Sequence, residues 1–133
     1  MHILVATEQM DMRLAIELYL AEEPGVTLVG SASEAPSLRP LVRTARPDLV
    51  VLDWALPGQF PKNLTAEIKR IAPPPQVIVL GTQMEQRPAA LAAGADAFVL
   101  QADPPARLLT AVREARLRRA PTEDRTRTET RGE

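Results

Sequence analysis

The sequence predicts a single α/β domain built on a doubly wound, five-stranded parallel sheet with helices on both faces. Five short apolar runs, typical of strands, alternate along the chain with segments whose apolar residues recur at helical spacing. Parallel strands need crossover helices, and this alternation supplies one between each pair of strands. At 133 residues and 45% hydrophobic content, the chain is long enough to bury one core.

Composition excludes several classes of function. The chain has no cysteine and a single histidine, His2, which argues against thiolate chemistry, disulfides and His- or Cys-based metal sites. A net charge of −1 gives no bulk attraction to nucleic acid or to a membrane surface. No apolar run approaches the roughly 18 residues of a membrane span. Residues 1–9 lack the basic and apolar regions of a signal peptide, so we expect a cytoplasmic protein.

The first helix is expected between strands at residues 2–6 and 26–30. It ends at Pro24 and Gly25, which break helices. One helically spaced stripe is expected to face the core, and it consists of Met10, Leu14, Leu18 and Ala21. A second stripe is either overhang of the core face or a homodimer surface that pairs with the last helix, and it consists of Met12, Ile16 and Tyr19.

The second helix precedes the strand at residues 49–53 and carries its apolar face at Leu38, Leu41, Val42 and Ala45. Pro40 lies within it, and proline is tolerated in the first turn because the N–H there has no partner inside the helix. We therefore expect this helix to start close to Pro40.

The second half of the chain predicts three more helices and two strands. The third helix is marked by Leu64, Ile68 and Ile71 and stops at the three prolines of 73–75. Strands follow at 77–80 and 97–100, with a short helix at 87–93 between them. Asp103 is expected to cap the fifth helix, with Pro104 as its first residue. The apolar face of that helix consists of Leu108, Leu109, Val112 and Leu117.

The last residues differ in composition from the rest. Residues 121–133 contain no large apolar side chain and cannot bury apolar surface. We therefore expect a folded domain over residues 1–120, followed by a disordered tail or truncated linker over 121–133.

The stretch VVLDWALPG, residues 50–58, points to a site. Asp53 ends an apolar run typical of a strand buried on both faces, and Pro57 and Gly58 then turn the chain. Open α/β sheets bind ligands at the carboxyl ends of their strands. The alternative is that Asp53 only caps a loop, because aspartate favours turns.

Other polar residues should lie beside Asp53, because the carboxyl ends of parallel strands meet at one edge of the sheet. The first strand delivers Thr7 and Glu8 to this edge. The fourth strand delivers Gly81 and Thr82, and the fifth delivers Gln101.

This set resembles the receiver domain of two-component response regulators over residues 2 to about 119. The matching segments are ILVATE, LVGSASE, PDLVVLDWALPG, VIVLGT and GADAFVLQAD, of which the LDxxLPG and GADxF patterns are the most specific. The resemblance implies the flavodoxin-like receiver fold, a five-stranded parallel sheet of strand order 2-1-3-4-5 with five helices.

The resemblance also implies a function in phosphorelay signalling. A receiver takes a phosphoryl group from a histidine kinase onto the aspartate that corresponds to Asp53. The transfer uses a divalent cation, usually Mg²⁺, held here by Glu8, Asp53 and the backbone carbonyl of Ala55. A hydroxyl after the fourth strand and a lysine after the fifth bind the phosphoryl oxygens.

The sequence departs from the family at most of these positions. The first strand should end in two acids, but it ends in Thr7 and Glu8, whose extra methylene shifts the carboxylate by about 1.5 Å. The switch hydroxyl falls on Gly81, and Thr82 comes one residue late, so its side chain should point elsewhere.

The fifth strand departs as well. Gln101 stands where the lysine is expected, so it can donate hydrogen bonds but carries no charge. Phe98 occupies the aromatic switch position without a hydroxyl, and Ala102 follows in place of a proline or an aspartate.

Two readings of different class follow. The first is an atypical receiver with a degenerate site, not an enzyme beyond weak self-phosphorylation, that acts as an interaction module for a histidine kinase or a downstream effector. The second is a working phosphoacceptor, phosphorylated at Asp53 with Mg²⁺. We favour the first, because neither Gly81 nor Gln101 offers a cation. A flavin-binding domain of the same topology fits poorly, because TEQMD is a poor phosphate loop.

Overall fold

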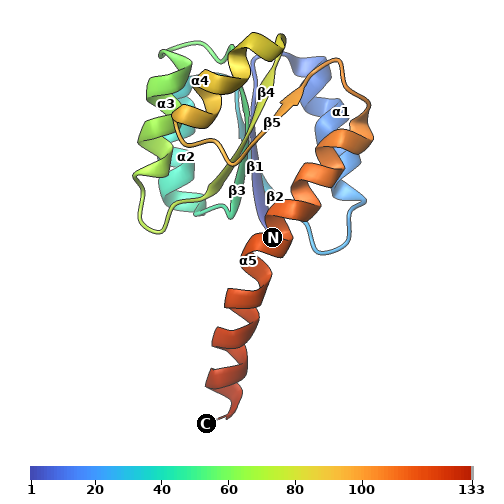
Figure 1. Cartoon of the computed structure of the whole chain (residues 1–133), viewed down its shortest axis with the longest axis vertical. Helices are drawn as coiled ribbons and strands as arrows, with labels where there is room; N and C mark the ends of the chain where they lie inside the picture. The colour runs from blue at the N-terminus through green and yellow to red at the C-terminus, as the bar shows by residue number, and fades with distance from the viewer. Residues whose placement is uncertain (133) are drawn as a thin grey trace.

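The computed structural model describes the backbone of residues 1–132 and the side chains of residues 1–118. Its centre is one parallel sheet of five strands in the order β2-β1-β3-β4-β5 (Figure 1). The strands are β1 (His2–Ala6), β2 (Thr27–Ala32), β3 (Leu49–Asp53), β4 (Gln76–Gly81) and β5 (Ala97–Leu100). The predicted fold class and strand order are confirmed.

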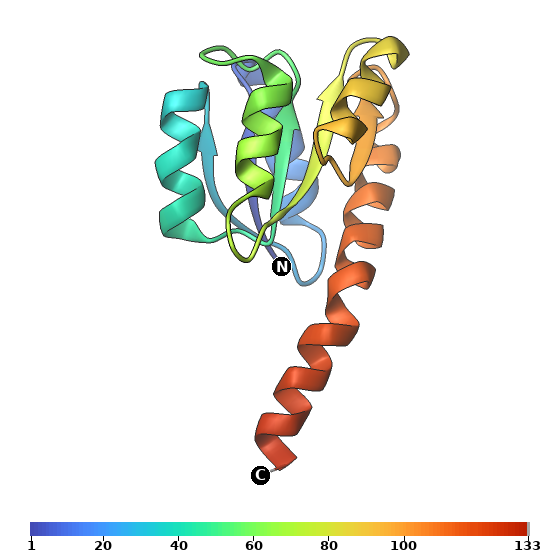
Figure 2. The same ribbon diagram turned by 60° about the vertical axis from the view of Figure 1, so that its left-hand side comes forward.

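Helices cover both faces of this sheet. They are α1 (Met10–Ala21), α2 (Ala35–Ala45), α3 (Pro61–Lys69), the short 3₁₀ helix η1 (Met84–Gln86), α4 (Arg87–Ala92) and α5 (Pro105–Gly132). Helices α1 and α5 lie on one face, and α2, α3 and α4 lie on the other (Figures 1 and 2). Each crossover between parallel strands therefore contributes a helix to one of two outer layers.

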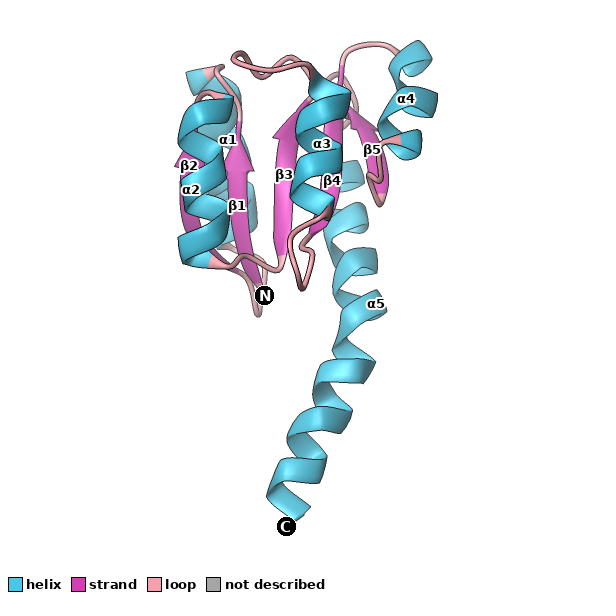
Figure 3. Cartoon of the chain, turned by 90° about the vertical axis from the view of Figure 1, so that its left-hand side faces the viewer, coloured by secondary structure: helices cyan, strands magenta, loops and turns pink. Residues whose placement is uncertain are grey.

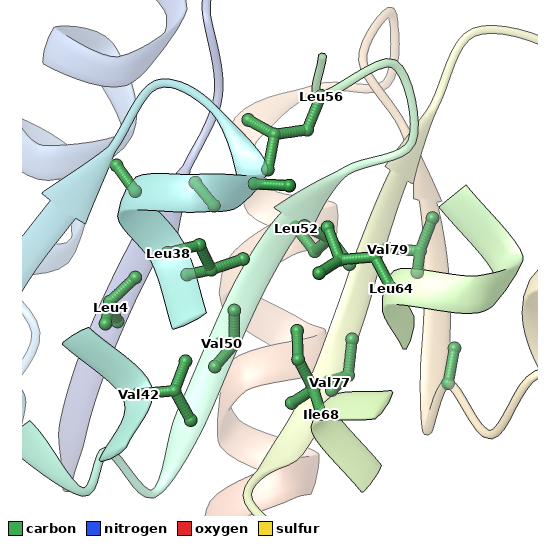
Figure 4. Packing of buried hydrophobic residues seen from close by; sticks show 14 of the residues in the cluster. Leu4, Leu38, Val42, Val50, Leu52, Leu56, Leu64, Ile68, Val77 and Val79 are labelled. Atoms are coloured by element: carbon green, nitrogen blue, oxygen red, sulfur yellow. The ribbon is translucent and has the colours of Figure 1, made fainter. Parts of the chain in front are cut away.

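The alternation of side chains along β3 divides the core in two. All five residues of β3 are buried. Leu49 and Val51 pack toward α1 and α5, whereas Val50 and Leu52 pack among Leu38, Leu64 and other residues of α2 and α3 (Figure 4). A strand enclosed on both faces holds its last residue, Asp53, in a fixed position at the carboxyl edge.

The orientation predicted for α1 is wrong. Leu14 and Leu18, expected in the core, are 49% and 72% exposed, whereas Ile16 and Leu20 are buried. Both stripes have helical spacing, so periodicity alone could not decide between them. The buried position of Ile16, in the core beneath α1 and α5, removes it from any surface that a second copy could contact.

The expected position of Pro40 is also wrong, because α2 begins at Ala35 and Pro40 lies inside the helix. The helix starts early because the N–H of Ala35 donates to the carbonyl of Pro57, 2.8 Å away. Burial of Ala35, Leu38 and Val42 on one face then outweighs the hydrogen bond that a proline cannot make.

Helix α5 starts and ends later than expected. It begins at Pro105, and the carboxylate of Asp103 accepts the N–H of Leu100 instead of acting as the predicted cap one residue before the helix. Its backbone is helical to Gly132 and extends away from the sheet (Figure 3). The disordered tail or truncated linker expected over 121–133 stays a prediction. Extending a formed helix avoids the cost of nucleation, and arginine and glutamate have good helix propensity, whereas Pro121 inside this segment lacks the N–H for one helical hydrogen bond.

The position of the domain boundary at residue 120 stays a prediction, and Glu133 lies outside the described residues. Among the helices that the structure describes, none is long and apolar enough to cross a membrane.

Candidate functional site

The candidate site lies at the carboxyl edge of the sheet, where β1, β3, β4 and β5 end side by side. Asp53, the last residue of β3, is 2% exposed, and Thr7, just after β1, is 1% exposed. Gln101 follows β5, and its backbone N–H donates to the carbonyl of Gly81 at the end of β4. The strand ends therefore bring Thr7, Asp53 and Gln101 together, as the sequence predicted.

Three neutral donors surround the Asp53 carboxylate. The hydroxyl of Thr7 donates to Oδ2 at 2.8 Å. The backbone N–H of Ala55 and the side-chain amide of Gln101 donate to Oδ1 at 2.9 and 3.2 Å. A buried carboxylate must be hydrogen-bonded to be tolerated, and these three bonds satisfy both of its oxygens without a cation.

Gln9 extends this network, although the sequence did not indicate it. Its backbone N–H donates to the hydroxyl oxygen of Thr7, 3.1 Å away, which leaves the Thr7 hydroxyl hydrogen for Asp53. Its side-chain amide lies 3.4 Å from Oε1 of Gln101. Gln9 thus contacts both side chains that donate to the carboxylate.

The space beside Gly81 is filled by an aromatic ring. A Cβ atom at Gly81 would meet the ring of Phe98, with Cε1 2.5 Å away, and Oε1 of Gln86, 2.7 Å away. Real Cβ atoms essentially never come so close to another heavy atom. The ring of Phe98 therefore occupies the space that a switch side chain at position 81 would fill. Phe98 also packs against the core cluster that contains Leu38 of α2 and Leu64 of α3.

Gln86 holds the loop between β4 and η1. Its Oε1 accepts the backbone N–H groups of Thr82 and Gln83, at 2.8 and 3.2 Å. The side chain of Thr82 is exposed, so it does not replace the hydroxyl missing from Gly81. Gln86 was not among the residues predicted for the site, although the three-residue spacing of Gln83 and Gln86 is the signal of the capping box found here.

The expected metal ligands, Glu8, Asp53 and the backbone carbonyl of Ala55, stay a prediction. Glu8 is exposed. Ala55 contributes its N–H to Asp53 rather than leaving both carboxylate oxygens open to a cation. Within the described part of the chain, no three His, Cys, Asp or Glu side chains come together as a metal-binding group.

Comparison with known proteins gives a family match. The model of the family described as response regulator receiver domain matches residues 3–113. A protein-glutamate methylesterase/protein-glutamine glutaminase of Burkholderia thailandensis is 31% identical over 91 residues, which are 68% of this chain and 26% of that protein. The chain therefore spans about a quarter of the length of this curated relative.

Solved structures show the same fold. The response regulator domain of Thermotoga maritima CheB superposes with a TM-score of 0.78 at 21% identity, covering 86% of this chain and 95% of that chain. A two-component response regulator of the LuxR family from Aurantimonas sp. SI85-9A1 gives a TM-score of 0.79 at 24% identity, covering 85% and 82% of the two chains. At these identities the likeness establishes the fold alone.

Proposed function

Because the chain belongs to the response regulator receiver domain family of two-component systems, we propose that it is an atypical receiver whose output does not depend on phosphate. Receiver domains are signalling modules that interact with kinases or effectors. The proposed role is to bind such a protein partner in the cytoplasm, with no direct contact to nucleic acid.

One observation carries the proposal, namely the neutral hydrogen-bond network around Asp53. Phosphoryl transfer depends on cationic groups and preorganised donors that stabilise the negative charge on the phosphoryl oxygens. In this chain the donors at Asp53 are a hydroxyl, a backbone N–H and an amide, none of which carries a charge. These donors stabilise the unmodified carboxylate, and a phosphorylated Asp53 would lose some of them.

The packing of Phe98 supports the same conclusion. A receiver switch needs a hydroxyl after the fourth strand, and Gly81 has none. The ring of Phe98 and the amide oxygen of Gln86 leave no room for a Cβ atom there. The region that would respond to phosphate is filled and hydrogen-bonded without it.

The residues present fit the family's Mg²⁺ poorly. A hard divalent cation prefers several oxygen ligands that are free to coordinate it. Both Asp53 oxygens already accept hydrogen bonds, and Glu8 is exposed. We therefore propose that Mg²⁺ binding is weak.

The second candidate function is a working phosphoacceptor. It is favoured by the position of Asp53 at the carboxyl end of β3, where its Oδ1 accepts the N–H of Ala55 two residues on. An acceptor aspartate in that position could still react with a strong phosphodonor.

Phosphorylation in solution separates the two functions. Incubation with acetyl phosphate and Mg²⁺, followed by intact-protein mass spectrometry, should leave nearly all of the wild-type chain unmodified. Gln101→Lys places a cation beside the carboxylate and should raise the modified fraction, whereas Gln101→Lys with Asp53→Asn should abolish it. Conversion of most of the wild type to an Asp53 phospho-form that lasts for minutes would establish the second function instead.

We also propose a homodimer, on a different surface from the stripe that contains Ile16. Met10, Leu14 and Leu18 form a row of large exposed apolar side chains on α1. Residues 10–23 hold four carboxylates and one arginine, whereas residues 105–118 hold four arginines and one carboxylate. A two-fold pairing that sets α1 of one copy beside α5 of the other would bring groups of opposite charge together, apart from Glu23 and Arg113, which already pair within one chain.

A further inference from the structure

A cavity of about 570 Å³ lies at the end of the sheet opposite Asp53. It is bordered by the last turn of α2, the loop into β3 and the loop from α3 into β4, whose connections lie at one end of the molecule (Figure 3). Asp48 precedes β3 and Gln76 begins β4, so the cavity adjoins the amino ends of these strands. Its volume is within the range of sites that bind small molecules.

The lining of this cavity combines an apolar wall with two arginines. The wall is formed by Val42, Pro47, Ile71, Ala72, Pro73, Pro74 and Pro75. The arginines are Arg43, in the last turn of α2, and Arg46, just after it. Within residues 1–118, neither guanidinium has an ion pair or a side-chain hydrogen bond, whereas the nearby Arg39 pairs with Glu67 at 2.8 Å.

The backbone at Arg46 is strained. Its φ is +46°, in the left-handed region that glycine and asparagine usually occupy at the end of a helix. Strain of this kind is found more often at functional sites than elsewhere. A glycine would adopt this left-handed backbone conformation at lower energy, so the presence of an arginine here needs an explanation.

From this cavity we propose a binding site for a small organic anion, namely a phosphate or carboxylate attached to an apolar body. Two guanidinium groups can bind such an anion through charge-assisted hydrogen bonds, and the prolines and Ile71 can pack against its apolar part. Asp48 also lines the cavity, but its Oδ2 accepts the N–H of His2 at 2.6 Å. The site is separate from Asp53 and does not depend on the function proposed for it.

Gln76 connects this site to α5. Its side-chain amide donates to the carbonyl of Ala115 at 2.7 Å, and its Oε1 accepts Nε of Arg118 at 2.9 Å. Gln76 also lines the cavity, so a bound anion would lie next to the residue that holds α5 where the helix leaves the sheet.

The test uses three probes that separate charge from apolar contact, namely phenyl phosphate, inorganic phosphate and phenol. Amide chemical shifts of the full chain should show saturable binding of phenyl phosphate at Arg46, Ile71 and Gln76. Inorganic phosphate and phenol should each bind at least about tenfold more weakly, because each lacks one half of the contact.

Variants identify the site. Arg46→Gly removes the guanidinium but suits the left-handed backbone, so it should weaken phenyl phosphate binding about tenfold or more without lowering the thermal midpoint. Arg43→Gln should also weaken binding, whereas Arg70→Gln, an exposed arginine outside the cavity, should not. Asp53→Asn should bind normally. Absence of saturable shifts, equal binding by the Arg46→Gly variant, or shifts centred on Asp53 would overturn the proposal.

Discussion

At the scale of single residues, Gly81 stands where the receiver family has its switch hydroxyl, and its neighbours occupy the space that such a side chain would need. Glycine is required there because Phe98 and Gln86 occupy the space of any side chain. The ring, the amide oxygen and the absent Cβ form one packing unit. A change at any of these residues should therefore affect the other two.

Gly81→Ala should destabilise the domain by about 1–3 kcal/mol, because the Phe98 ring must leave its position. In a Phe98→Ala background the same change should cost much less, and urea unfolding of the four proteins in this double-mutant cycle measures the coupling. Gly30→Ala is the matched control, since the nearest atom to its Cβ would be 3.9 Å away. A cost for Gly81→Ala that is the same with and without the ring would contradict this account.

The sequence predicted most of the site residues but not how they interact. Thr7, Asp53 and Gln101 could be placed together because strand ends meet at one edge of a parallel sheet. The filled space at Gly81 could not be foreseen, because a glycine in a sequence does not reveal which neighbour approaches it. The role of Glu8 as a metal ligand stays a prediction, and its side chain is exposed.

At the scale of elements, an ion pair ties the end of α1 to α5. Nε and Nη2 of Arg113 donate to the two carboxylate oxygens of Glu23, both at 2.9 Å. The hydrogen bonds from Arg113 lower the pKa of Glu23 below its usual 4.5, and the same bonds raise the pKa of Arg113. The pair joins the only two helices on this face of the sheet in the described structure (Figure 1).

Stability should depend on pH through this pair. Because the pKa of Glu23 is lower in the folded state, its contribution is present above the unfolded-state pKa and is lost as the pH falls through the folded value. Between about pH 5 and pH 3, the thermal midpoint of the wild type should fall more than that of a Glu23→Gln variant. Glu22→Gln, which changes an exposed neighbour, should follow the wild type. Parallel curves for wild type and Glu23→Gln would show that the pair contributes nothing.

Elements were predicted well where one physical signal dominated. The strand at 49–53 was correct to the residue, because an uninterrupted apolar run fits only a strand buried on both faces. Helix α1 was oriented wrongly because it carries two apolar stripes, and helix α2 began early because a tertiary hydrogen bond to Pro57 fixes its start. The local sequence pattern indicates neither which stripe of α1 is buried nor the residue at which α2 begins.

At the scale of the whole molecule, the apolar row on α1 is a surface that the fold leaves uncovered. Leu18, 72% exposed, is the most exposed residue of the proposed dimer contact. Leu18→Asp should therefore convert a concentration-dependent dimer to a monomer, as measured by sedimentation or light scattering, without loss of thermal stability. Phe60→Asp alters an equally exposed residue, 74%, at the start of α3 and should not change the mass. A wild type that is monomeric at high concentration would disprove the dimer.

Helix α5 has a mechanical consequence. It is anchored to the sheet at Ala115 and Arg118 through Gln76, and residues 119–132 continue for about 21 Å at 1.5 Å per residue. A helix that is held at one end acts as a lever arm for its free end. A tilt of roughly ten degrees at the anchor would move the far end by about 4 Å over this length. A small tilt of α5 where Gln76 of β4 holds it would thus become a much larger movement at the far end of the helix.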